Sequence, residues 1–218
     1  EKFHGSFFLL VEGAIPTAKE GRYCIVGETK DSLGHHREIT MMELVRDLAP
    51  KSLATVGIGT CSAYGGIPAA AGNVTGAKSV RDFFAEENID KLLVNVPGCP
   101  PHPDWMVGTL VAAWSHVLNP KEHPLPELDE NGRPLLFFGD NIHENCPYIH
   151  LYDNSEFAET FTRPGCKAEL GCKGPSTMAD CYKRRWNNGI NWCVENAVCI
   201  GCVEPDFPDG KSPFYVAE

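Results

Sequence analysis

The sequence lacks three features that mark common classes of protein. It has no apolar run long enough to cross a bilayer, since the best stretch, residues 106–117, is short and contains His116. It lacks an excess of positive charge, with 29 acidic residues against 19 Lys and Arg and a net charge of -10. It also shows no signal peptide, and its opening Glu1-Lys2-Phe3 stands just before a strand-like run. These absences argue against a membrane span and against nucleic-acid or anionic-membrane partners, and they predict a processed or truncated chain.

The composition is that of an ordinary globular protein of one or two domains. The 218 residues include 43% hydrophobic and 22% charged residues, so the chain can bury a full-sized core. The acidic balance suits a cationic protein partner.

The first part of the chain alternates between strand-like and helix-like runs. Continuous apolar runs at residues 7–11, 53–58 and 91–96 predict strands buried on both faces. The helices expected from apolar spacing are 38–49, 80–87 and 104–118, the last capped by Asp104 after Pro103. A last apolar run, 135–138, follows the turn signal Asn131-Gly132. This alternation predicts an α/β fold with a mainly parallel sheet and helices on both faces.

After about residue 140 the pattern becomes irregular. Glycine, proline, cysteine and aromatic residues are scattered without sustained periodicity, and the helical candidates, 155–161 and 176–185, are short. We therefore expect a first domain over 1–135, a Pro/Glu-rich connection over 120–133, and a second domain over 136–218. Metal ligation is expected to stabilise the second domain, because it can substitute for burial of an apolar core.

Ten cysteines are distributed unevenly along the chain. Three lie in the first 145 residues and seven in the remainder. A disulfide framework fits poorly, because such frameworks belong to chains too small to form a core. Ligation of metals or clusters is the better interpretation.

Cys61 and Cys99 each follow a predicted buried strand. They stand in Gly57-Ile58-Gly59-Thr60-Cys61 and in Val96-Pro97-Gly98-Cys99-Pro100-Pro101. Ligands in open α/β sheets bind beyond the carboxyl ends of the strands, where neighbouring loops converge. The glycines allow close approach of the backbone to a bulky group. This placement favours a shared ligand site, although each cysteine alone could be a buried structural residue.

The second half carries eight potential ligands, which divide into two sets of four. They begin with an H-x-x-C pair and end with C-I-G-C, and they are His143, Cys146, Cys166, Cys172, Cys181, Cys193, Cys199 and Cys202. Structural zinc is the competing assignment, because it takes four thiolates or three thiolates and an imidazole. Zinc modules favour two close pairs, however, and these spacings are irregular. The nearby Trp186 and Trp192 also suit the apolar casing of an iron–sulfur cluster.

Several strings resemble the small subunit of nickel–iron hydrogenases. They are VEGAIP (11–16), GTCSAYGG (59–66), VPGCPPHPDW (96–105), IHENCP (142–147) and the run 166–214 that ends in CIGCVEPDFPDGKSPF. The match covers essentially the whole chain in the right order. It implies a flavodoxin-like α/β domain followed by an irregular, cluster-bound domain.

The resemblance also implies which residues bind three clusters. Cys61 and Cys99 would supply two ligands of a proximal [4Fe–4S] cluster. A distal [4Fe–4S] cluster would be bound by His143, Cys146, Cys166 and Cys172. A medial cluster would be bound by Cys181, Cys199 and Cys202.

The sequence departs from the common family pattern at two places. Where most members have a proline between the first two medial cysteines, this chain has Cys193, so we expect a four-iron medial cluster. That feature resembles the nickel–iron–selenium branch. The family's N-terminal C-x-x-C, which gives the other two proximal ligands, is absent before Cys61. Cys24 is left over and is expected in the core, and the role of Glu12, directly after the first strand, stays open.

The resemblance implies that the chain is the electron-transfer subunit of a hydrogenase. Hydrogen would be cleaved at a Ni–Fe(–Se) centre on a large partner subunit, in an obligate heterodimer. Electrons would pass through the three clusters to an external carrier such as a multihaem c-type cytochrome, and the complex would be periplasmic. A related subunit of a respiratory quinone-reducing complex shares the α/β domain, but the eight ligands of the second half argue against it.

Overall fold

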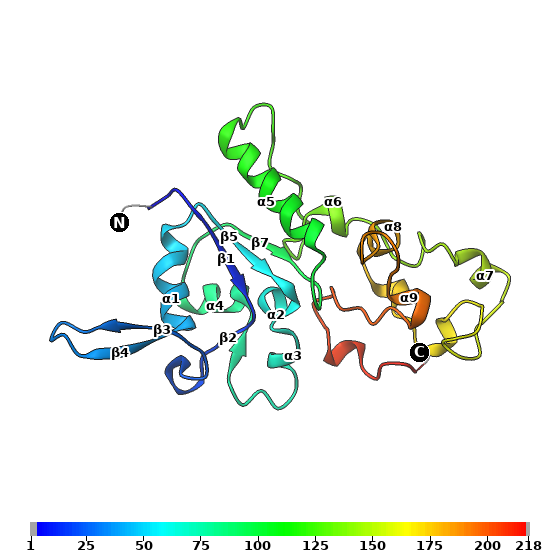
Figure 1. Ribbon diagram of the computed structural model, residues 1–218, viewed down its shortest axis with the longest axis horizontal. Helices are drawn as coiled ribbons and strands as arrows, with labels where there is room; N and C mark the ends of the chain where they lie inside the picture. Colours follow the sequence, from blue (N-terminus) through cyan, green and yellow to red (C-terminus); the bar gives the residue numbers. More distant parts are fainter. Residues whose placement is uncertain (1–3, 217–218) are drawn as a thin grey trace. The chain divides into compact units, whose positions relative to one another are not determined.

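The computed structural model describes residues 4–216, and the chain divides into two compact units between residues 100 and 101. Figure 1 labels the helices and strands of both units. The domain boundary expected after residue 135 stays a prediction. The expected fold class is confirmed, because the structure is a mixed α/β protein with a parallel sheet.

A three-stranded parallel sheet forms the centre of the first unit. Its strands are β1 (Phe8–Glu12), β5 (Ala54–Ile58) and β7 (Leu93–Val96), in the order β1-β5-β7. All five residues of β5 are buried, as expected of a central strand in a parallel sheet. The carboxyl ends of β5 and β7 therefore lie side by side, and Cys61 and Cys99 follow them.

Two amphipathic helices build the core of this unit. Helix α1 (Met41–Leu48) begins at a capping box, in which Thr40 accepts from the backbone of Glu43 and Glu43 accepts from the backbone of Thr40. Helix α4 (Val80–Glu87) has the predicted bounds. The buried core residues are Val11, Ile15, Val45, Ala49, Val80, Phe83 and Phe84. Each of the larger side chains, from valine to phenylalanine, contributes about 1.5–3 kcal/mol on full burial.

The sequence analysis missed an antiparallel hairpin of β3 (Ile25–Lys30) and β4 (His36–Thr40). The helix expected over 38–49 was wrong at its start, because residues 38–40 are the end of β4 and the cap at Thr40 fixes where helix α1 begins. The other elements of the unit are β2 (Ile15–Pro16), β6 (Ala77–Lys78), α2 (Gly59–Tyr64), α3 (Gly66–Ala69), η1 (Ala18–Gly21) and η2 (Ala49–Lys51).

The second unit begins with its one long helix among the described residues, α5 (Pro103–Leu118). Its cap is His102 rather than the expected Asp104, because Pro103 occupies the first helical position. The His102 ring accepts from the backbone N–H of Asp104 at 3.0 Å through Nδ1. In residues 4–216 no helix is long and apolar enough to cross a membrane.

The rest of the second unit is short turns of helix joined by loops. The helix expected over 155–161 was wrong, because this segment instead forms a bridge between Phe157 and Cys166. Of the helix expected over 176–185, only α8 forms. The short elements are α6 (Leu135–Phe138), α7 (Ile149–Asp153), η3 (Ala168–Leu170), η4 (Gly174–Ser176), α8 (Cys181–Arg184), α9 (Cys193–Asn196) and η5 (Asp209–Lys211).

Candidate metal centres

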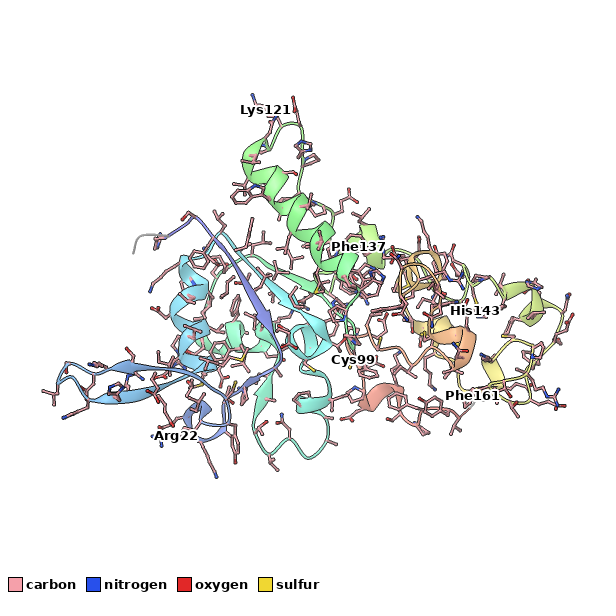
Figure 2. The ribbon with its side chains drawn as sticks, in the orientation of Figure 1. Arg22, Cys99, Lys121, Phe137, His143 and Phe161 are labelled. Atoms are coloured by element: carbon pink, nitrogen blue, oxygen red, sulfur yellow. The ribbon has the colours of Figure 1, made fainter. Side chains whose placement is uncertain are left out.

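Two loops at the carboxyl ends of β5 and β7 carry Cys61 and Cys99 in the first unit. Cys61 lies in α2, and Cys99 follows β7 and is exposed (Figure 2). The loops are tied reciprocally, because the Thr60 N–H donates to the Gly98 carbonyl at 3.0 Å and the Gly98 N–H donates to Thr60 Oγ1 at 2.8 Å. Burial raises the pKa of the Cys61 thiol, and the nearby Cys99 and Glu12 add to the rise. The structure thus brings the two predicted proximal cysteines together.

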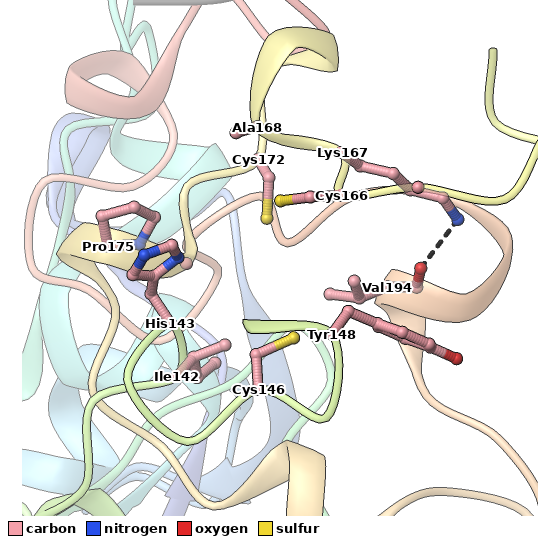
Figure 3. A pocket seen from close by; sticks show the side chains of 12 residues that line it. Ile142, His143, Cys146, Tyr148, Cys166, Lys167, Ala168, Cys172, Pro175 and Val194 are labelled. Carbon is pink, nitrogen blue, oxygen red and sulfur yellow. Dashed lines mark hydrogen bonds between the residues drawn. The ribbon is translucent and has the colours of Figure 1, made fainter. Parts of the chain in front are cut away.

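A pocket in the second unit brings together the four predicted distal ligands. Figure 3 shows the imidazole of His143 and the sulfur atoms of Cys146, Cys166 and Cys172 around one space. The empty volume is about 420 Å³, part of which is open to solvent. Apolar groups from Ile142 and other residues complete the lining.

An asparagine that the sequence analysis missed builds the H-x-x-C loop. Asn141 Oδ1 accepts from the backbone N–H groups of His143 at 2.8 Å and Glu144 at 3.2 Å. Its Nδ2 donates to the Pro175 carbonyl at 2.9 Å, which joins this loop to the segment after Cys172. The signal in the sequence is an Asn two residues before the ligand, as in an Asx turn.

The segment of Cys166 depends on a close backbone approach. Gly165 has φ +131°, and an added Cβ would lie 2.5 Å from the Ala158 nitrogen. The Cys166 N–H donates to the Glu156 carbonyl at 2.8 Å, and the Ala158 N–H donates to the Cys166 carbonyl at 2.9 Å. Only glycine fits before Cys166 in this arrangement.

The distal thiols lie in surroundings that disfavour free thiolates. Burial raises the pKa of Cys172 to about 11, and the charge of Cys199 adds to the rise. Burial also raises the pKa of Cys146. Metal ligation needs the deprotonated thiol, so binding here releases protons and compensates for burial of the charge.

The four predicted medial cysteines converge in a second group. Cys193 begins α9 and shares a hydrogen bond with the buried Cys199. That hydrogen bond, followed by burial and the charges of Cys199, Cys181 and Cys202, raises the pKa of Cys193. Burial raises the pKa of Cys181 well above its usual value, and Cys202 and Cys199 add to the rise. Cys193 and Cys181 therefore both lie close to Cys199 and Cys202.

Buried polar residues fix the loop that carries Cys199 and Cys202. The Cys199 sulfur lies 3.6 Å from Thr177 Oγ1. The stem of Lys211 packs on Gly201, where an added Cβ would lie 3.0 Å from three of its carbons. Just beyond the loop, a buried cluster joins Arg133 to Asp129 at 2.6 Å and to Glu204 at 3.1 Å. None of these supports was predicted from the sequence.

The donor chemistry fits iron–sulfur clusters. The two groups of the second unit offer seven thiols and one imidazole, which are the side chains that bind such clusters. Within residues 4–216, no three His, Cys, Asp or Glu side chains are grouped so that they could hold one metal ion. Cys24 lies outside these groups, with its sulfur 4.0 Å from the Met41 sulfur.

Two family models match the chain in succession. Residues 1–113 match the NADH ubiquinone oxidoreductase 20 kDa subunit, and residues 138–215 match the C-terminal part of the NiFe/NiFeSe hydrogenase small subunit. The second match separates this chain from a respiratory subunit that shares only the α/β part. It covers all eight predicted ligand residues of the second half.

Named relatives extend over the whole chain. The periplasmic [NiFeSe] hydrogenase small subunit of Desulfomicrobium baculatum is 89% identical over 100% of this chain and 69% of the relative. The periplasmic [NiFe] hydrogenase small subunit 1 of Nitratidesulfovibrio vulgaris is 46% identical over 96% of this chain and 62% of the relative. The solved H2-activated [NiFeSe]-hydrogenase of Dm. baculatum gives a TM-score of 0.97 at 89% identity, over 100% of this chain and 78% of that one.

The fold and its thiol groups define a cysteine-rich α/β subunit whose donors suit iron–sulfur clusters. The relatives identify which one: the chain belongs to the family of NiFe and NiFeSe hydrogenase small subunits. The resemblance found in the sequence, including that to the selenium branch, is confirmed. The assignment of individual ligands stays a prediction.

We expect Gly66→Ala to weaken cluster binding at Cys61. Gly66 has φ +52°, and an added Cβ would lie 3.0 Å from Cα and Sγ of Cys61, so the thiol would have to move. Gly72→Ala is the matched control, because Gly72 has φ +90° and no atom within 4 Å of an added Cβ. Left-handed strain costs both variants about 1–2 kcal/mol.

The measurement is iron content together with the electron paramagnetic resonance (EPR) spectrum of the reduced complex. Gly66→Ala should lose the iron and the signal of one cluster, while Gly72→Ala retains both. Equal iron content in the two variants would contradict a ligand role for Cys61.

Proposed function

We propose that the chain is the electron-transfer subunit of a hydrogenase that interconverts hydrogen with protons and electrons. It relays electrons from a Ni–Fe(–Se) site on a large subunit, in an obligate heterodimer, through three [4Fe–4S] clusters to an external carrier. The observation that carries the proposal is the convergence of Cys193 with Cys181, Cys199 and Cys202. The family supports it, since the named relatives are hydrogenase small subunits.

The residues of this chain bind and insulate the clusters, and the clusters supply one-electron redox chemistry when bound. Cys61 and Cys99 bind the proximal cluster. The distal ligands are His143, Cys146, Cys166 and Cys172, and the medial ligands are Cys181, Cys193, Cys199 and Cys202. Electron tunnelling weakens steeply with distance, so a relay of closely spaced centres is required.

The neutral imidazole of His143 gives the distal cluster one anionic ligand fewer than a four-thiolate site. Its pocket is partly open to solvent, and exposure and ligand charge both shift cluster potential. The ring of Tyr152 meets the His143 ring edge-on, with centroids 4.7 Å apart, and restricts its orientation. These features suit the point where electrons leave the chain.

A zinc-stabilised module is the alternative from another class, since thiolate and imidazole donors also bind zinc. Colour separates the two, because iron–sulfur proteins are brown and zinc proteins are colourless. We further propose a periplasmic location, because two of the relatives are named periplasmic hydrogenase small subunits.

Cys193→Pro tests the four-iron medial assignment. Cys193 is the first residue of α9, where proline is favoured, and Trp192 before it is extended at φ -147° and ψ 172°. The backbone should therefore accept proline while the site loses one thiolate and one iron. Loss of that negative charge should raise the medial potential.

The oxidised wild-type complex should show no three-iron EPR signal, and oxidised Cys193→Pro should gain one. Cys24→Ala is the control and should leave the spectrum unchanged, because Cys24 lies outside the ligand groups. A strong three-iron signal in oxidised, undamaged wild type would show that Cys193 is not a ligand.

We propose that the acceptor is a protein with a cationic surface, such as a multihaem c-type cytochrome. Exposed carboxylates flank the segments that build the distal pocket, among them Glu144 next to His143 and Glu156, whose carbonyl accepts from Cys166. The net charge of -10 adds a long-range attraction.

The rate of cytochrome reduction should fall as ionic strength rises. At low salt, Glu144→Gln combined with Glu156→Gln should slow it severalfold. Glu38→Gln, at an exposed position in the β3–β4 hairpin, is the control and should have little effect. A rate independent of salt and of both carboxylates would contradict a charge-guided acceptor.

A further inference from the structure

Lys167 is a buried lysine between the two cysteine groups of the second unit. Its side chain is only 6% exposed. Its ammonium donates to the carbonyl of Val194 at 2.7 Å and to that of Glu195 at 2.8 Å, both in α9. Figure 3 shows the first of these hydrogen bonds, with the Lys167 side chain leading from the distal pocket toward Val194. Lys167 therefore joins the segment of Cys166 to the helix that carries Cys193.

The charge of Lys167 has no carboxylate to balance it. Among residues 4–216, no Asp or Glu side chain forms an ion pair with it. Burying an ammonium that contacts only neutral carbonyls is costly. Two predicted ligands lie next to the residues that this lysine joins: Cys166, a predicted distal ligand, directly precedes Lys167, and Cys193, a predicted medial ligand, directly precedes Val194.

We propose that Lys167 is a positioning residue that couples the distal and medial clusters, by fixing helix α9 and by stabilising the added electron on either cluster. This inference rests on the proposed function, because it takes Cys166 and Cys193 as ligands. An electron that enters a cluster adds negative charge, and a fixed cation nearby lowers the energy of the reduced form. One lysine thus raises the reduction potential of both clusters.

The test compares three variants of the intact complex by EPR-monitored redox titration, with iron content measured in parallel. Lys167→Met removes the charge and both hydrogen bonds, whereas Lys167→Arg retains a cation. Lys183→Met removes an exposed lysine two residues from Cys181 and is the matched control for net charge.

In Lys167→Met the distal and medial midpoint potentials should both become more negative. At the wild-type midpoint, the ratio of reduced to oxidised cluster should fall about ten-fold, as expected for one partly screened charge. In Lys167→Arg both midpoint potentials should stay close to the wild-type values. In Lys183→Met they should change little. Unchanged potentials in Lys167→Met, or an equal shift in Lys183→Met, would overturn the proposal.

Iron content also tests whether the positive charge of Lys167 is needed. If Lys167→Met loses iron and Lys167→Arg retains it, the cation is needed and the proposal stands. If both lose iron equally, the site requires only the shape of lysine and the proposal fails. A wild-type complex without medial and distal cluster signals would instead refute the proposed function, which separates the two failures.

Discussion

Convergence of cysteine sulfurs is the constraint on which the second unit depends. Beyond α5, its described helices have at most five residues, too short to be stable alone. Its loops bring seven thiols and one imidazole into two groups, in which burial raises the pKa of Cys172 and Cys181. Bringing protonated thiols together contributes little to the free energy of folding by itself. Binding a metal cluster releases the protons and makes the same groups a source of folding energy.

The first unit has a different source of stability. Its parallel sheet and helices α1 and α4 enclose an apolar core in which Ile15, Val80 and Phe83 have no exposed surface. This frame places Cys61 and Cys99 at adjacent strand ends without help from a ligand. The chain thus combines a frame with its own apolar core at the predicted proximal site with irregular loops, poor in regular secondary structure, at the predicted distal and medial sites.

Sequence reasoning predicted the elements whose pattern is local. The three strands of the parallel sheet, α4 and most of α5 followed from apolar runs and helical spacing. The expected burial of β1 on both faces was wrong, because β1 is an edge strand and Leu10 in it is 47% exposed. The β3–β4 hairpin was not predicted, because its residues are mostly exposed and show no apolar alternation. The short helical candidates failed because tertiary contacts, such as the bridge between Phe157 and Cys166, determine that region.

The candidate ligands were predictable from motifs, but their supports were not. Asn141, Thr177 and Arg133 act on residues distant in sequence, or through turns that many polar residues could form. Lys167 looks like an ordinary surface lysine in the sequence, and only the fold shows it buried against α9. Candidate ligands can be recognised in the sequence by their residue type and spacing. The residues that support them are recognised only from the contacts that the fold creates.

Hydrogen exchange after iron removal tests most directly whether ligation stabilises the second unit. The purified complex is stripped of iron by a chelator, and amide exchange is then followed by mass spectrometry along the chain. The account predicts that peptides from 101–218 lose protection, while β5 and α4 in the first unit retain theirs. Full protection of the second unit in the iron-free protein would contradict it.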